Sequence, residues 1–222
     1  MITRALIGLN VLAFVWEVFA SGGGMLSFMG SDTQGVQYVL EVGALTPNSV
    51  LLQHEWYRLV TSAFLHGGLL HITVNMISLW YLGRFIEAIA GSARMTVIYL
   101  VSMIVSGLGV VYLSSPEYAN VPTLGASGAI FGLFGALFAI GFKLGRPGMQ
   151  LVRANLGILI LNLVITFAVP GISWQAHVSG LALGFLLTLA IYYPPRRVAP
   201  VVTDSLSGDQ YETEYQAPEQ RP

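Results

Sequence analysis

Charge is the component that this sequence has least of. Its 222 residues include 10 Lys and Arg and 11 Asp and Glu, so only 9% are charged, whereas 55% are hydrophobic and the mean hydropathy is +0.69. Soluble proteins carry about 25% charged residues. A chain of this length has too small an interior to bury so much apolar surface away from water. The composition therefore predicts a membrane protein surrounded by the lipid bilayer.

Cysteine and an excess of basic residues are also missing. The absence of cysteine excludes a disulfide scaffold, a thiolate metal site and a cysteine nucleophile. A formal net charge of −1, with no basic stripe, excludes a protein that binds nucleic acid. Any function must therefore be sought in the few polar groups of an apolar chain.

Six segments are apolar and long enough to be membrane-spanning helices, which need about 20 residues each. They are residues 5–20, 59–82, 95–113, 127–142, 151–169 and 175–192. The predicted fold is an all-α membrane domain of six transmembrane helices over residues 1–193. Residues 194–222 are polar and rich in Pro, Glu, Gln and Ser, a composition typical of a disordered tail.

The first apolar segment has an alternative interpretation as a cleavable signal peptide. Arg4 precedes it, and the sequence Val18-Phe19-Ala20 before Ser21 resembles a cleavage site. Cleavage would leave five spans and place the two chain ends on opposite sides of the membrane. We prefer six spans because the basic residues then divide more sharply between the two sides.

The basic residues set the direction of the helices, since cytoplasmic loops of membrane proteins are enriched in Lys and Arg. With six spans and a cytoplasmic N-terminus, nine of the ten basic residues are cytoplasmic and Arg58 alone is outside. The nine are Arg4, Arg84, Arg94, Lys143, Arg146, Arg153, Arg196, Arg197 and Arg221. This distribution predicts a multi-pass protein of the cell membrane with both termini in the cytoplasm.

The long outer loop, residues 21–58, is too short to be a stable soluble domain without cysteine. We expect it to lie in the membrane interface and to pack on the helix ends, with Trp56 and Tyr57 as anchors. Glu17 is also expected at this interface. At the inner surface, Glu87 and Arg84 are spaced i, i+3 and are expected to pair.

Polar side chains inside a bilayer are costly and indicate function by default. They occur in three spans: His66, His71 and Asn75 in the second, Ser127 at the start of the fourth, and His177 near the start of the sixth. In the predicted topology these three spans all begin on the outer side. The polar residues therefore lie at a similar depth in the outer leaflet, although they are far apart in sequence.

Small residues in the fourth and sixth spans favour close packing of these helices. Gly180 and Gly184 share a face with His177, and GxxxG pairs let membrane helices approach each other closely. Such an approach is needed if a hydroxyl on one helix is to contact an imidazole on the next. A hydrogen-bonded imidazole activates a serine as nucleophile. Ser127 and His177 are therefore predicted to form a catalytic dyad, with no acidic residue placed to complete a triad.

Donors for an oxyanion are also present. His71 and Asn75 are spaced i, i+4 and project from one helix face. The Asn75 amide and a ring N–H of His71 are candidate donors, together with the backbone N–H of Ser127, which begins a helix. His66 lies about 140° around the helix from His71, which is poor geometry for a shared zinc ion.

Three motifs here resemble those of the rhomboid family of intramembrane serine proteases, in its six-span prokaryotic form. Residues 125–128 (Gly-Ala-Ser-Gly) resemble the GxSG nucleophile motif, residues 177–184 resemble the HxxGxxxG helix of the catalytic histidine, and residues 66–75 match HxxxxHxxxN. The resemblance covers residues 55–184. It implies Ser127 as nucleophile, His177 as general base and acid, and an oxyanion hole formed by His71, Asn75 and Ser127. The supporting residues that it implies are His66, Phe131, Gly125, Gly128, Gly180, Gly184 and Arg58.

The resemblance implies an endopeptidase that cuts peptide bonds in or near transmembrane segments of membrane proteins, without a cofactor or metal and with a monomer sufficient for catalysis. An alternative is a catalytically inactive rhomboid-like protein that binds membrane clients, against which the presence of both Ser127 and His177 argues. A zinc metalloprotease is excluded, since His54-Glu55 does not begin an HExxH motif. An intramembrane aspartyl protease is excluded because every Asp lies outside the predicted spans, at Asp32, Asp204 and Asp209.

Overall fold

The computed structural model describes residues 1–27 and 33–194, and this part of the chain is helical, with one isolated β-bridge between Leu45 and Thr123. The predicted disordered tail lies outside the described residues from residue 195 onwards. The elements are α1 (Ile2–Ala20), η1 (Gly24–Leu26), α2 (Gln34–Gly43), α3 (Pro47–Leu51), α4 (Arg58–Thr61), α5 (Leu69–Ala90), α6 (Ser92–Leu113), η2 (Pro116–Tyr118), α7 (Ser127–Lys143), α8 (Arg146–Ala168) and α9 (Trp174–Ile191).

Five of the described helices are both long and apolar enough to cross a membrane, namely α1, α5, α6, α8 and α9, while α7 is apolar but shorter, at 17 residues. Each coincides with one of the six predicted segments. The largest difference is at the second segment, which was predicted from residue 59 but begins as a continuous helix only at Leu69. Gly68, the residue directly before α5, has φ of 138°, a backbone conformation that favours glycine.

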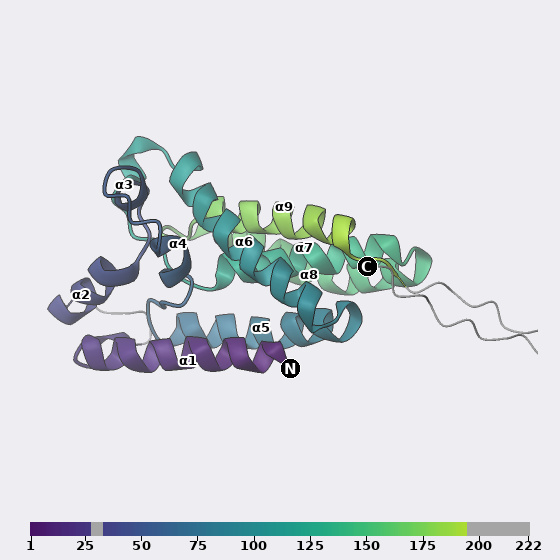
Figure 1. Ribbon diagram of the computed structural model, residues 1–222, viewed down its shortest axis with the longest axis horizontal. Coiled ribbons are helices and arrows are strands. Elements are labelled where there is room, and N and C mark those ends of the chain that lie inside the picture. The colour runs from purple at the N-terminus through teal and green to yellow at the C-terminus, as the bar shows by residue number, and fades with distance from the viewer. Residues whose placement is uncertain (28–32, 195–222) are drawn as a thin grey trace, which may run out of the picture.

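The helices form a bundle with two distinct ends (Figure 1). Helices α5, α7 and α9 begin at the end where α2, α3 and α4 gather, and the N-terminus of α1 and the last turn of α9 lie at the opposite end. Helix α1 runs beside α5, and α7 lies inside the bundle, where it packs against α9, α6, α8 and α5. The starts of three helices that are distant in sequence are thereby brought together.

Helix α7 is buried along most of its length, because its residues are small or apolar on every side. Two of its glycines touch the backbone of α9: a Cβ at Gly180 would overlap the carbonyl of Gly128, and one at Gly184 would overlap that of Gly132. The two helices therefore touch through their main chains, as the small-residue pattern predicted.

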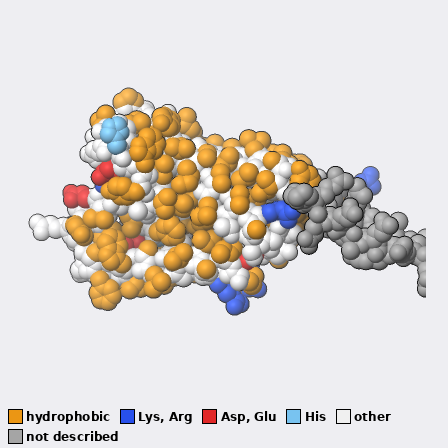
Figure 2. Space-filling model, in the orientation of Figure 1, with side chains coloured by type: hydrophobic (Ala, Val, Ile, Leu, Met, Phe, Trp, Pro, Cys, Tyr) orange, Lys and Arg blue, Asp and Glu red, His pale blue; other side chains and the backbone are white. Residues whose placement is uncertain are grey.

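The outer surface of the bundle is apolar between its ends. Figure 2 shows hydrophobic side chains over most of this face and charged side chains gathered toward the two ends. Helix α8, for example, exposes many large apolar side chains, among them Leu156, Ile158, Leu161, Val164 and Phe167. A water-soluble protein rarely exposes an apolar surface of this extent, so these faces match a lipid environment.

The segment between α1 and α5 folds onto the helix ends. Helix α2 packs Val36 and Val39 against α1 and η1, and Arg58 holds the following turn. The Arg58 guanidinium donates to the carbonyl oxygens of Ala44 (2.7 Å) and Glu41 (2.6 Å) and to the Glu55 carboxylate (2.6 Å). The hydrogen bond that Arg58 donates to the Glu55 carboxylate lowers the pKa of Glu55. Arg58 is therefore a structural tie within the loop.

Two acidic residues make contacts that the sequence did not predict. Glu17, which was expected at the membrane interface, is fully buried within the protein and accepts the backbone N–H of His66 (2.9 Å). Glu87 was expected to pair with Arg84. It instead accepts the backbone N–H groups of Ile2 (2.6 Å) and Thr3 (3.1 Å). The first N–H groups of α1 lack intrahelical acceptors and carry a positive partial charge, which a carboxylate from the neighbouring helix satisfies.

The main-chain contact between α7 and α9 predicts a specific sensitivity to one added methyl group. We expect Gly184→Ala to lower the free energy of unfolding by about 1–3 kcal/mol, the usual cost of overpacking, because its Cβ has no room against Gly132. Gly157→Ala is the matched control, since Gly157 also lies within a helix but a Cβ there meets nothing within 4 Å. Unfolding in detergent measures both, and equal stability of the two variants would contradict the contact.

Candidate functional site

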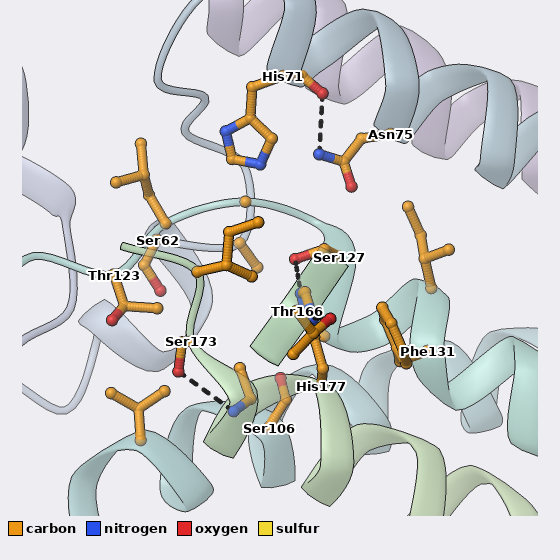
Figure 3. A pocket seen from close by; sticks show the side chains of 18 of the residues that line it. Ser62, His71, Asn75, Ser106, Thr123, Ser127, Phe131, Thr166, Ser173 and His177 are labelled. Carbon is orange, nitrogen blue, oxygen red and sulfur yellow. Dashed lines mark hydrogen bonds between the residues drawn. The ribbon is translucent and has the colours of Figure 1, made fainter. Parts of the chain in front are cut away.

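A cavity of about 620 Å³ lies at the end of the bundle where α5, α7 and α9 begin. Its walls come from these helix starts, from α6, from the last turns of α8 and from the 169–173 loop. Figure 3 shows polar side chains from several elements turned toward this space. The volume is in the range of ordinary ligand sites, about 300–1,000 Å³.

Ser127 is the first residue of α7 and lines the cavity. The turn before it is fixed by Gly125, whose N–H donates to the Ser62 carbonyl (2.8 Å) and whose φ is +118°. A Cβ at Gly125 would lie 2.7 Å from Nε2 of His71, so glycine is required both by its conformation and by the space. As the first helical residue, Ser127 has a backbone N–H without an intrahelical acceptor.

His177 lies in the first turn of α9 and contacts Ser127. Its Nε2 is 2.8 Å from Oγ of Ser127, and this hydrogen bond joins α7 to α9 (Figure 3). The ring of Phe131 stacks on the imidazole, with centroids 4.1 Å apart and planes inclined by 11°. Phe131 is one turn after Ser127 on the same helix, so α7 supplies both the hydroxyl and the surface that fixes the plane of the ring.

The glycines predicted as supporting residues act through the backbone. Gly128 faces Ser106 of α6 as well as Gly180 of α9, and Gly184 faces α7 one turn further along. None of them contributes a side chain to the cavity. Their effect is to hold the first turns of α7 and α9 close enough for the Ser127–His177 hydrogen bond.

His71 and Asn75 lie on α5 across the cavity from His177 (Figure 3). The Asn75 amide nitrogen donates to the carbonyl of His71 (3.0 Å), which leaves its second N–H available. Nδ1 of His71 accepts the backbone N–H of Gly67 (3.2 Å). The proton of this neutral imidazole is therefore on Nε2, the nitrogen that faces Gly125.

His66 stands behind His71 and is absent from the cavity lining. It is fully buried, and its ring lies edge-on to the His71 ring with the centroids 5.2 Å apart. Its Nδ1 is 3.1 Å from the Phe64 carbonyl. The sequence placed it within the second span, whereas it precedes α5. Its contacts support the position of His71.

Thr166 is a contact of His177 that sequence analysis missed. It lies near the end of α8, is 3% exposed, and places Oγ1 2.7 Å from Nδ1 of His177. It belongs to none of the recognised motifs, and its helix is not the one that carries His177. Only the contact between α8 and α9 brings the two together, and Figure 3 shows their side chains next to each other.

No group of three or more His, Cys, Asp or Glu residues is arranged to hold a metal ion within residues 1–27 and 33–194. The described side chains of this cavity provide a serine hydroxyl that is hydrogen-bonded to an imidazole, with hydrogen-bond donors on the opposite wall.

Comparison with known proteins gives one family. A family model described as a Rhomboid domain matches residues 53–194. The chain is 36% identical over 148 residues to "Rhomboid protease GluP" of Bacillus subtilis (strain 168), which covers 66% of this chain and 28% of that protein. It is 36% identical over 136 residues to "Putative rhomboid protease YdcA" of the same organism, covering 60% and 66%. It is 34% identical over 134 residues to "Rhomboid protease GlpG" of Yersinia pestis (strain Pestoides F), covering 59% and 46%.

The matched region thus spans between about a quarter and two thirds of the length of these relatives. The family match at residues 53–194 contains α4 to α9 and every residue of the cavity lining except Leu45, while α1, α2 and α3 precede it.

Proposed function

The chain belongs to the rhomboid family and is a multi-pass membrane protein, and on this premise we propose that it is an intramembrane serine endopeptidase. The observation that carries the proposal is the 2.8 Å hydrogen bond between Oγ of Ser127 and Nε2 of His177, inside a cavity at one end of an apolar bundle. Relatives that are named rhomboid proteases support the same class of activity.

In the proposed reaction, Ser127 is the nucleophile and His177 the general base. His177 takes the hydroxyl proton as Oγ attacks the carbonyl carbon of the scissile bond, and a tetrahedral intermediate forms. The imidazolium then gives this proton to the leaving amine, which departs and leaves an acyl-enzyme. A water molecule, activated by the same imidazole, hydrolyses the acyl-enzyme and restores Ser127.

The oxyanion of the tetrahedral intermediate needs preorganised donors. We assign this role to the backbone N–H of Ser127, the free amide N–H of Asn75 and the Nε2–H of His71. Two contacts support it: Gly67 occupies Nδ1 of His71, and the Asn75 amide is held by the His71 carbonyl on the cavity side of α5. One such donor typically contributes about 3–4 kcal/mol to transition-state stabilisation.

The proposed substrates are transmembrane segments of other membrane proteins. A peptide bond within a helix is shielded by its own hydrogen bonds, so the substrate must unwind locally, which Gly, Pro or polar residues near the cleavage point favour. A small residue before the scissile bond is the expectation carried over from the family. We propose that a monomer is sufficient for catalysis.

We propose six membrane crossings, with α7 as the fourth and with both termini in the cytoplasm. Residues 1–193 then form one membrane domain with an interfacial outer segment at about 21–58, and residues 194–222 form a cytoplasmic tail. The gathering of the N-terminus and the end of α9 at one end of the bundle supports this arrangement (Figure 1). Enclosure of α7 by other helices allows it to cross although it is the shortest of the six.

The dyad predicts loss of cleavage when either member is removed. Purified protein in detergent is incubated with a single-span membrane substrate that carries Gly or Pro within its span. We expect Ser127→Ala and His177→Ala each to lower the rate at least about a thousandfold. The first variant lacks the nucleophile, and the second lacks the base that activates the serine hydroxyl. The matched controls are Ser115→Ala and His54→Ala, both exposed and outside the cavity, which should retain full activity.

A fluorophosphonate probe separates the proposal from its alternative. Labelling that requires both Ser127 and His177 supports an activated serine. If the wild type neither labels nor cleaves while membrane proteins co-purify with it, the chain is a client-binding protein and the protease proposal is wrong.

The oxyanion assignment predicts an effect on turnover with little effect on substrate binding. We expect Asn75→Ala to lower kcat about a hundredfold and to leave KM within about threefold, because the amide acts on charge that develops only in the transition state. Asn48→Ala, on α3 outside the cavity, is the matched control. Unchanged kcat in Asn75→Ala would exclude Asn75 from the oxyanion hole.

The six-span topology predicts that the residues flanking α7 lie on opposite sides of the membrane. The chain has no cysteine, so Ser115→Cys and Arg146→Cys each introduce a single thiol, before and after α7. We expect a membrane-impermeant maleimide to label Ser115→Cys in intact cells, and Arg146→Cys only after permeabilisation. Labelling of both from the same side would show that α7 does not cross.

A further inference from the structure

The nitrogen of His177 that faces away from Ser127 contacts the hydroxyl of Thr166 at 2.7 Å. Given the proposed dyad, on which this inference rests, we propose that Thr166 is a positioning residue. Its hydroxyl fixes His177 in the tautomer with the proton on Nδ1, so that Nε2 presents a bare lone pair to the Ser127 hydroxyl.

The proton of the Thr166 hydroxyl determines which tautomer is present. Oγ1 of Thr166 lies 2.7 Å from the carbonyl oxygen of Asn162, one turn earlier on α8. A carbonyl oxygen has no proton to donate, and a hydroxyl has only one. Two acceptor oxygens at this distance without a proton between them would repel each other, so the Thr166 proton lies on the line to Asn162.

With its proton directed to Asn162, Oγ1 of Thr166 can only accept from His177. The neutral imidazole carries one proton, which must then be on Nδ1. The opposite arrangement, in which Thr166 donates to Nδ1, would leave Asn162 and Thr166 as facing acceptors. It would also put the imidazole proton on Nε2, directed at Ser127, and a protonated Nε2 could not accept the serine proton. The 3% exposure of Thr166 leaves little room for water to compensate.

Thr166 thus takes the orienting part of the acid in a Ser-His-Asp triad, without its charge. When His177 accepts the serine proton, its Nδ1–H stays bonded to Thr166, and the hydroxyl passes polarisation on to the Asn162 carbonyl. Three helices then fix the position and orientation of the His177 imidazole. Helix α7 contributes Ser127 and the stacked Phe131, α9 carries His177 itself, and α8 contributes Thr166.

Thr166→Val tests the hydroxyl with little change in shape. We expect kcat to fall about 10- to 100-fold, which corresponds to the loss of a hydrogen bond to a group that becomes charged, while KM stays within about twofold. Thr166→Ser should restore kcat to within about threefold of the wild type. Thr188→Val makes the same change at a fully buried threonine of α9 whose Oγ1 has no partner among the described residues, and it should leave kcat unchanged.

A second measurement reads the tautomer without activity. The chain has four histidines, so a sample labelled with ¹⁵N-histidine gives few ring signals, and His177→Gln assigns those of His177. We expect the wild type and Thr166→Ser to show the Nδ1–H pattern in long-range ¹H–¹⁵N spectra, and Thr166→Val to lose it.

The two measurements separate this inference from the proposed function. An Nε2–H pattern in the wild type, an unchanged pattern and kcat in Thr166→Val, or an equal loss of kcat in Thr166→Val and Thr166→Ser would each overturn the role of Thr166. A wild type that shows the Nδ1–H pattern but neither cleaves nor labels with fluorophosphonate would instead overturn the protease, with the contact between Thr166 and His177 intact.

Discussion

The main-chain contact between α7 and α9 is the constraint on which the site depends. The side chains of Ser127 and His177 are short. Their 2.8 Å hydrogen bond therefore forms only if the two helices approach more closely than interposed side chains would normally permit. Glycine supplies this approach: the carbonyls of Gly128 and Gly132 occupy the space that a Cβ at Gly180 or Gly184 would need. The packing and the chemistry are therefore set by the same pair of helices.

An apolar surrounding imposes a second constraint, which is that buried polar groups need partners from within the protein. Glu87 on α5 accepts the free N–H groups at the start of α1, and Arg58 donates to main-chain carbonyls of the outer segment. Asn162 and Thr166 continue this pattern within α8, since each bonds to a carbonyl one turn earlier. Thr166 differs because its Oγ1 also lies 2.7 Å from a ring nitrogen of His177.

The sequence was sufficient for what depends on composition and local spacing. Hydropathy located the helices, the family predicted from the motifs is confirmed, and glycine spacing correctly placed α9 against α7. Contacts between distant segments could not be predicted in this way. The partner of Glu87 depends on α1 lying beside α5, and the partner of Glu17 depends on the turn before α5, where His66 lies outside the helix. Thr166 gave no signal, because one threonine in an apolar helix has no spacing to interpret.

The position of each group relative to the rigid helix pair explains why, in the role proposed for Thr166, a hydroxyl can serve where other sites use a carboxylate. The stacked Phe131 and the main-chain contacts already fix the plane and position of the His177 ring, so the remaining freedom is which nitrogen carries the proton. One acceptor of defined direction settles that choice. A carboxylate at the same place would add a buried charge whose desolvation in a membrane protein costs several kcal/mol unless it is fully paired. A threonine bonded to its own helix provides the direction without that cost.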